Sequence, residues 1–163
     1  MNIVVILDSD FLSAFLKIEQ MPLIRDLYQV EKVTVQPAVY REIALTNLLT
    51  RLTEFDWIQV IAPSTDQIEK LTTDESFRAL GAGEQEAIAL AIERAPAVLL
   101  GNDNQARRVA ARLGVDVINI PALLFACKQA NLVNHKTLIT LINDLRVKDF
   151  FGFRQTDLDL LLG

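Results

Sequence analysis

The stretch that decides the fold is Ile3-Val4-Val5-Ile6-Leu7-Asp8-Ser9-Asp10-Phe11-Leu12, near the start of the chain. It begins with five consecutive apolar residues, most of them β-branched. A run so short and so apolar predicts a strand that is buried on both faces, as in a parallel sheet. Two acids then follow at the carboxyl end of this strand, where open α/β sheets place their ligand sites. We therefore expect the acids at positions 8 and 10 to have a chemical use.

Length and composition are those of an ordinary globular domain. The chain has 163 residues, of which 51% are hydrophobic and 23% charged, and we expect residues 1–163 to form a single domain. No apolar run approaches the roughly 18–20 residues that span a bilayer. A single cysteine, Cys127, provides neither a disulfide framework nor a zinc-ligand spacing. These features predict a cytoplasmic protein without membrane association, in which Cys127 is a buried core thiol.

The net charge of −5 disfavours a protein whose main task is to grip a long phosphate backbone through a basic face. It is compatible with an enzyme that meets nucleic acid at one metal-loaded site. An acidic metal-binding cluster would itself add to the negative charge.

Short apolar runs alternate with helical patterns along the chain, which predicts an α/β domain with a central parallel sheet and right-handed crossovers. The most polar segment, residues 72–83, is predicted to be a mobile loop. The predicted strands are residues 3–7, 32–35, 57–63, 97–100 and 115–118. The predicted helices are residues 10–19, 21–28, 37–45, 64–71, 84–94, 104–113, 121–131 and 134–145.

Acids recur at four places, each at the end of a predicted strand or in the first turns of an adjacent helix. Each also has a purely structural explanation: Asp10 and Asp103 are placed to cap helices, Glu84 lies near the positive end of its helix, and Glu42 could be a solvated helix position. The four places are Asp8 with Asp10, Glu42, Glu84 with Glu86, and Asp103.

Oxygen ligands without histidine or cysteine suit a hard cation. Two carboxylates about 4 Å apart repel by roughly 4 kcal/mol at an effective dielectric of 20, so such a cluster needs a cation or partial protonation. Mg²⁺ or Mn²⁺ held in this way can activate water and stabilise an in-line phosphoryl displacement. The residues alone thus predict divalent-metal phosphodiester or phosphate chemistry.

Four segments resemble, in order and spacing, the motifs of PIN domains, the family of the VapC-like toxin ribonucleases. Residues 5–12 resemble the strand with its D-[ST]-[ND]-x-[LI] start, and residues 38–43 the x-V-x-x-E-[IL] helix. Residues 80–91 resemble the L-G-x-G-E-x-E-A-I-x-L-A helix of one subgroup. Residues 98–110 resemble the strand followed by D-[DE]-x-x-A-R-x-x-A. The resemblance covers nearly the whole chain and implies a PIN-like, three-layer α/β/α fold.

The resemblance implies a metal-dependent ribonuclease that acts on RNA with Mg²⁺ or Mn²⁺, often as the toxin paired with an antitoxin protein. Its acidic quartet would be Asp8, Glu42, Glu84 and Asp103. Asp8 and Asp103 would ligate the metal most directly. Glu42 and Glu84 would complete the cage or hold waters.

Accessory positions follow from the same motifs, and two of them depart from the subgroup. Asn102 stands where the subgroup commonly has an acid, and Asn119-Ile120-Pro121 stands where it usually has a small Gly-Thr pair. Arg107 is placed either to reach a phosphate or to form a surface salt bridge. The accessory candidates are Ser9, Asp10 (ligand or helix cap), Glu86, Asn102 and Arg107.

Two alternatives stay open at this point. A haloacid-dehalogenase-type phosphatase would use Asp8 as nucleophile and Asp10 as general acid, but the lysine and the Ser/Thr that it also needs lack convincing candidates. A non-catalytic PIN-like module that binds protein or RNA is favoured by the acidic charge and by Asn102. Three phenylalanines near the carboxyl end either mark a homodimer interface or pack back onto the domain; they are Phe150, Phe151 and Phe153.

Overall fold

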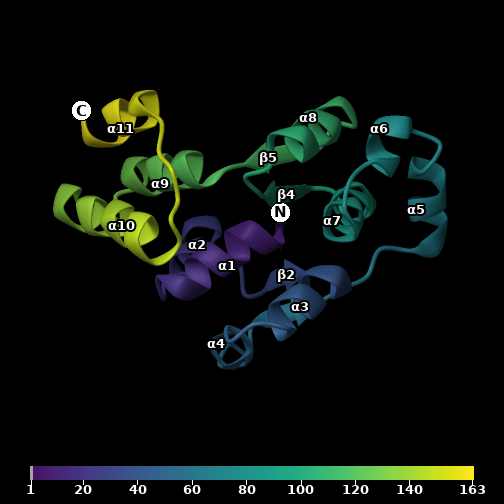
Figure 1. Ribbon diagram of the computed structural model, residues 1–163, viewed down its shortest axis with the longest axis horizontal. Helices are drawn as coiled ribbons and strands as arrows, with labels where there is room; N and C mark the ends of the chain where they lie inside the picture. The colour runs from purple at the N-terminus through teal and green to yellow at the C-terminus, as the bar shows by residue number, and fades with distance from the viewer. Residues whose placement is uncertain (1) are drawn as a thin grey trace.

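The computed structural model describes residues 2–163, and within them five parallel strands form one sheet in the order β3-β2-β1-β4-β5 (Figure 1). The strands are β1 (Val4–Leu7), β2 (Val33–Val35), β3 (Ile58–Val60), β4 (Ala97–Leu100) and β5 (Asp116–Ile118). All five lie within ranges predicted from the sequence. The longest pairing joins β1 to β4, from Val4 opposite Ala97 to Leu7 opposite Leu100, so these two strands end at the same level.

The strand order reverses direction between β1 and β4. The chain first builds outward through β2 to β3, and then returns to the other side of β1 for β4 and β5. The connections that leave β1 and β4 therefore diverge at the carboxyl edge, which is where such sheets bind their ligands.

Helices cover both faces of the sheet, and the side chains of β1 alternate between the two resulting cores. Val5 and Leu7 enter the first core and Ile6 the second, as the two-residue period of a strand requires. The first core packs against α1 (Ser9–Lys17), α2 (Met21–Tyr28), α3 (Pro37–Ala44), α4 (Leu49–Thr53), α9 (Ile120–Gln129), α10 (His135–Lys148) and α11 (Gln155–Leu162). The second packs against α5 (Thr65–Leu71), α6 (Glu75–Arg78), α7 (Ala82–Glu93) and α8 (Asn104–Arg112). The predicted three-layer α/β/α arrangement is confirmed.

The segment predicted as a mobile loop, residues 72–83, is instead anchored, and the prediction was wrong in this respect. It contains α6, whose N-cap Asp74 accepts a hydrogen bond from the Phe77 amide at 3.0 Å. The Phe77 side chain is fully buried, and Nη2 of Arg112 on α8 donates to Asp74 Oδ1 at 3.0 Å. The Arg112 partner holds the pKa of Asp74 down to about 2.

Two of the three carboxyl-terminal phenylalanines pack back onto the domain, and the homodimer interface stays a prediction. Phe151 and Phe153 pack against the first core, with their rings edge to face at 4.9 Å, whereas Phe150 is 88% exposed. Cys127 is buried, as predicted, and burial raises the pKa of its thiol to about 11. Among residues 2–163, no helix has both the length and the apolar character needed to cross a membrane.

Candidate active site

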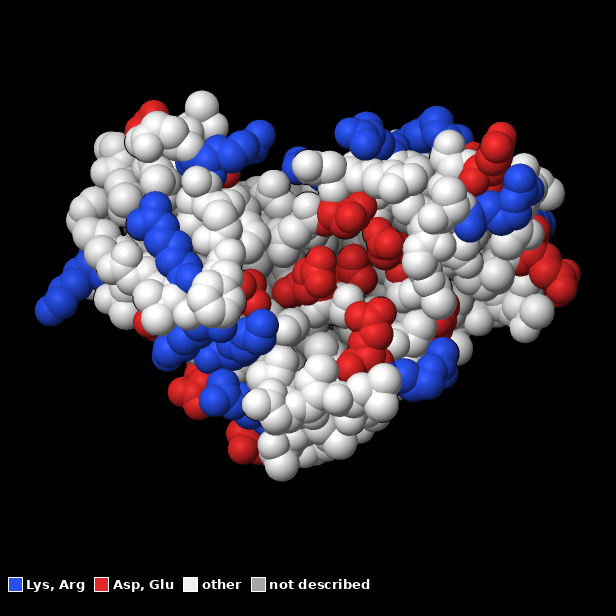
Figure 2. Space-filling model, in the orientation of Figure 1, with Lys and Arg blue, Asp and Glu red and all other residues white. Residues whose placement is uncertain are grey.

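A cavity of about 220 Å³ collects the four predicted quartet acids. We call it the acidic cavity. Figure 2 shows acidic side chains gathered in the middle of this face of the molecule. The lining residues come from the turns after β1 and β4 and from α1, α3 and α7; they are Asp8, Ser9, Asp10, Glu42, Gly81, Gly83, Glu84 and Asp103.

Asp8 follows β1 directly and is the most enclosed acid of the cavity, with only 8% of its surface exposed. Its amide donates to Leu100 O at 2.9 Å, which ties it to the neighbouring strand. Its Oδ1 accepts a hydrogen bond from the Ser9 amide at 2.8 Å. Asp8 is therefore the N-cap of α1. The expectation that Asp10 caps this helix was wrong, because the helix begins one residue earlier and places Asp10 in its first turn.

The surroundings of Asp8 disfavour the charged form of its carboxyl group. Burial, followed by the charges of Glu84, Asp10 and Glu42, raises the pKa of Asp8 to about 7, against the lowering effect of the Ser9 amide. In the absence of a cation, the charged form of this carboxyl group is therefore disfavoured. A bound divalent cation would favour the charged form, because a nearby opposite charge lowers the pKa of a carboxyl group.

Glu84 enters the cavity from the first turn of α7. Its Oε1 accepts a hydrogen bond from the Gly81 amide at 3.3 Å, while its Oε2 is buried and has no hydrogen-bond partner among residues 2–163. Burial and the charges of Asp103, Asp10 and Glu42 raise its pKa. A buried carboxylate oxygen without a partner needs an explanation, and a cation is one that fits its chemistry.

Asp10, Glu42 and Asp103 complete the ring from more exposed positions. Asp103 is the N-cap of α8, and its Oδ1 accepts a hydrogen bond from the Ala106 amide at 2.8 Å. Burial, together with the charge of Glu42, raises the pKa of Asp10. The cavity therefore receives carboxylates from α1, α3, α7 and the turn before α8.

Gly83 explains how α7 comes so close to the other acids. A Cβ atom built on Gly83 would lie 3.2 Å from Val39 Cγ2, 3.8 Å from Glu42 Oε1 and 3.9 Å from Asp8 Oδ1. Its space is therefore already taken by α3 and by two acids of the cavity. Gly83 was not predicted as a cavity residue, although two glycines flanking one residue at a helix start are a signal of close backbone approach.

Two accessory candidates lie outside the acidic cavity and have structural partners. Both carboxylate oxygens of Glu86 accept from the Ala38 amide, at 3.2 and 3.3 Å, so Glu86 joins α7 to the start of α3. Asn102 Oδ1 accepts from the Ile120 amide at 3.0 Å, which joins the end of β4 to the start of α9. The side chain of Asn102 therefore links β4 to α9.

Arg107 lies in a neighbouring cavity of about 260 Å³, which Asn102, Asn119 and Arg154 also line. Asn119 is the N-cap of α9 through a 3.0 Å hydrogen bond from the Ala122 amide. Both departures from the subgroup pattern thus have local structural roles. Ser9 lines the acidic cavity and holds Asp8 through its backbone amide.

The acids surround the cavity without converging on one point. Within residues 2–163, no group of three His, Cys, Asp or Glu side chains is close enough to hold a metal ion as the side chains stand. Metal binding would therefore require side chains to turn inward, which mutual repulsion opposes when no cation is present. The oxygen-only donor set, the unpartnered Glu84 Oε2 and the raised pKa of Asp8 all fit a hard divalent cation.

The fold and the cavity define an α/β protein with an acidic site at the switch point of a parallel sheet. Comparison with protein families matches residues 4–156 to the PIN domain, so the chain belongs to the PIN domain family. The PIN domain is a nuclease-type fold. A comparison with curated proteins found no matching relative.

Proposed function

We propose that this protein is an endoribonuclease that hydrolyses RNA phosphodiester bonds at the acidic cavity with Mg²⁺ or Mn²⁺. The observation that carries the proposal is that Asp8, Glu42, Glu84 and Asp103 all line one cavity. The raised pKa of Asp8 supports the proposal, because strongly perturbed pKa values are common at functional sites.

Within this proposal, Asp8 and Asp103 would hold the cation through the carboxylate oxygens that do not cap α1 and α8. Glu84 would offer Oε2, and Glu42 would complete the set or hold a water. The bound cation would supply Lewis acidity that activates water and stabilises the oxygens of the displaced phosphate. Asp10, at the rim, is a further acceptor for a water or for the cation.

Arg107 has a different proposed role. It lies beside the acidic cavity rather than in it, one turn into α8. A guanidinium there can pair with a backbone phosphate of the RNA. We expect Arg107 to orient the strand relative to the acids, without taking part in the chemistry.

The biological setting belongs to the proposal as well. The resemblance of the four motifs to the VapC-like toxin ribonucleases supports a role as the toxin of a toxin–antitoxin pair in the cytoplasm, with an antitoxin protein as partner. A homodimer also stays a prediction, for which Phe150 is the exposed apolar candidate.

Two alternatives are weaker. A non-catalytic PIN-like module for RNA or protein contact is favoured by Asn102, whose side chain is committed to the Ile120 amide. The phosphatase hypothesis gains no support, because the acidic cavity has no lysine among the described residues that line it.

The test is RNA cleavage by the wild-type protein with Mg²⁺, with Mn²⁺ and with EDTA, beside the variant Asp8→Asn. We expect cleavage that needs the divalent ion and is lost in the variant. Absence of cleavage with any divalent ion, in a folded protein that still binds RNA, would favour the non-catalytic module. Phosphate release from small monoesters would point to the phosphatase.

A further inference from the structure

A buried glutamine at the carboxyl edge of the sheet has no partner for either of its polar atoms. Gln36 follows β2 directly and is fully buried. Its Nε2 and its Oε1 both lack a hydrogen-bond partner within residues 2–163. Gln36 is the N-cap of α3, but its side chain makes no capping hydrogen bond. Because buried polar groups are nearly always paired in folded proteins, two unpaired atoms on one amide need an explanation.

The pairing of β1 with β2 places Gln36 beside Asp8. The strands are parallel with Ile6 opposite Thr34, and two residues further along the two strands come Asp8 and Gln36. The backbone is extended at both of these positions, and side chains two residues apart in a strand leave the sheet on the same face. Ile6 belongs to the second core, which α7 covers. Asp8 and Gln36 therefore lie side by side on the α7 face of the sheet.

The unpaired atoms gather around the acidic cavity. In the part of the chain that the structure describes, the buried side-chain atoms without a partner belong to Gln36 and to Glu84 of α7. Glu84 lines the acidic cavity, whereas Gln36 does not. Gln36 thus stands behind the lining, next to Asp8. This is the place of a group that acts on a metal ligand rather than on the metal.

Asp8 has room for a second hydrogen-bond donor. Its Oδ1 accepts from the Ser9 amide at 2.8 Å, and no other group of residues 2–163 donates to its carboxylate. The same oxygen faces α7, since it lies 3.9 Å from a Cβ atom built on Gly83. A carboxylate oxygen accepts two hydrogen bonds. A second donor on the α7 side would fix the orientation of Asp8 and leave Oδ2 free.

We infer that Gln36 is a positioning residue for Asp8, and that its Nε2 donates to the Asp8 carboxylate when a divalent cation occupies the acidic cavity. The inference rests on the proposed function, since the cation belongs to that proposal. The acids do not converge as they stand, so the carboxylates must turn to hold a cation, and Gln36 supplies a partner for Asp8 in that arrangement. The remaining Oε1 can accept from a buried water, as unpaired buried groups commonly do.

The test is the affinity of the protein for Mn²⁺ alone, measured by electron paramagnetic resonance without RNA. Gln36→Met keeps an unbranched side chain of similar length and removes both polar atoms. We expect its Kd for Mn²⁺ to increase by about tenfold to a hundredfold, as for other partners of metal ligands. Its Tm in EDTA should rise by roughly 2–4 °C, because the unpaired amide leaves the core.

The matched control is Thr34→Val, on the same strand and the same face of the sheet. Thr34 is 1% exposed, but its Oγ1 has a partner, since Gln59 Nε2 donates to it at 2.9 Å. Removal of this paired hydroxyl should lower the Tm and leave the Kd for Mn²⁺ unchanged. The two variants should therefore change stability in opposite directions, and only Gln36→Met should weaken the ion.

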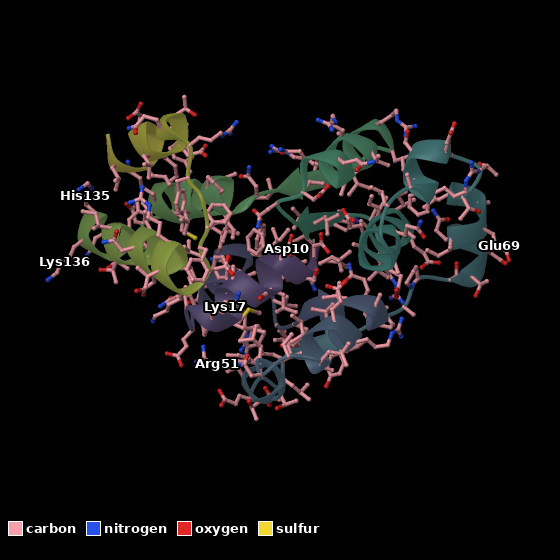
Figure 3. All side chains as sticks on the ribbon, in the orientation of Figure 1. Asp10, Lys17, Arg51, Glu69, His135 and Lys136 are labelled. Atoms are coloured by element: carbon pink, nitrogen blue, oxygen red, sulfur yellow. The ribbon has the colours of Figure 1, made fainter. Side chains whose placement is uncertain are left out.

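Two further variants assign the bound Mn²⁺ to the acidic cavity. Asp8→Asn should abolish Mn²⁺ binding. Glu69→Gln changes an exposed acid on α5, at the far side of the molecule from Asp10 (Figure 3), and should bind Mn²⁺ as the wild-type protein does.

An unchanged Kd for Mn²⁺ in Gln36→Met overturns the inference, and a buried water that serves Gln36 alone would give this result. Weaker Mn²⁺ binding together with a lower Tm overturns it as well, because lost packing would then explain both. RNA cleavage by the wild-type protein is measured separately. Cleavage with unchanged Mn²⁺ affinity in Gln36→Met refutes the positioning role alone. Weaker Mn²⁺ binding in this variant, without cleavage by the wild type, supports the positioning role and refutes the nuclease.

Discussion

The β1–α1 turn and the β4–α8 turn share an aspartate that caps the following helix, but these two aspartates have different environments. Each places an aspartate after a buried strand, and each aspartate caps the helix that follows, with hydrogen bonds of 2.8 Å. Asp8 is 8% exposed, while Asp103 lies on the surface. Asp8 directly follows the central strand β1, and α7 lies so close to it that a Cβ atom on Gly83 would be 3.9 Å from Asp8 Oδ1. Asp103 comes three residues after the end of β4 and is exposed. The same sequence signal thus yields one carboxylate that is costly to ionise and one that is solvated.

The largest effect is expected from removing the charge of Asp8, the enclosed aspartate. Asp8→Asn should reduce metal-dependent RNA cleavage more than about a hundredfold, because it removes the carboxylate that most needs a cation. Asparagine can still cap α1, so the fold should persist by circular dichroism. A variant that cleaves at the wild-type rate would show that the enclosed aspartate is only a cap.

The next effect is on the pH dependence of stability, to which Asp8 in the β1–α1 turn should contribute. Asp8 has a pKa of about 7 in the folded protein and 3.8 as a model value, so the folded state holds its proton more tightly. Without metal, the free energy of unfolding should therefore increase as the pH falls from about 7 towards 4, and this gain should be lost as the pH rises again through 7. The change should be on the order of a few kcal/mol.

Denaturant unfolding at pH 5 and pH 8, in EDTA, measures this effect. Asp8→Asn should flatten the profile and stabilise the metal-free protein at pH 8. Saturating Mg²⁺ at pH 8 should raise the Tm of the wild-type protein. If the stability of Asp8→Asn depends on pH as steeply as that of the wild-type protein, the pH dependence does not come from Asp8.

A smaller effect is expected at the rim. Asp103→Asn should lower cleavage by about tenfold, less than Asp8→Asn, because water can replace an exposed ligand more easily. Its thermal stability should not change, since asparagine caps as well as aspartate. Asp103→Ala should lose about 1 kcal/mol in addition. Equal activity losses at positions 8 and 103 would show that enclosure does not decide their importance.

The smallest effect is expected at Glu86, which lies on the same helix as Glu84 but outside the acidic cavity. Glu86→Gln can still accept from the Ala38 amide, so we expect unchanged cleavage and less than about 1 kcal/mol of lost stability. The matched change Glu84→Gln should impair cleavage. A loss of cleavage in Glu86→Gln at unchanged stability would place this residue in the site.

The sheet could be predicted because its central strands are continuous apolar runs, which parallel burial requires. The short helices α4 and α6 could not, since four or five residues show no helical period. α6 in addition depends on the contact between Asp74 and Arg112, which are 38 positions apart.

For the candidate site, the sequence predicted which acids face one cavity, because topology brings strand ends together. It could not decide which of the two aspartates after β1 caps the helix, because both match the capping pattern. Nor could it show the cavity at the far end of α1. Lys17, Arg51 and Lys148 are far apart in the chain, and only the packing of α1, α4 and α10 brings them together.

The acidic cavity is also the meeting point of three helix starts, since the N-caps of α1, α7 and α8 are Asp8, Gly81 and Asp103. Each helix start carries about half a unit of positive charge, which partly offsets the repulsion between the acids. The same three helix starts therefore help the fold to hold these carboxylates close together when no cation is bound.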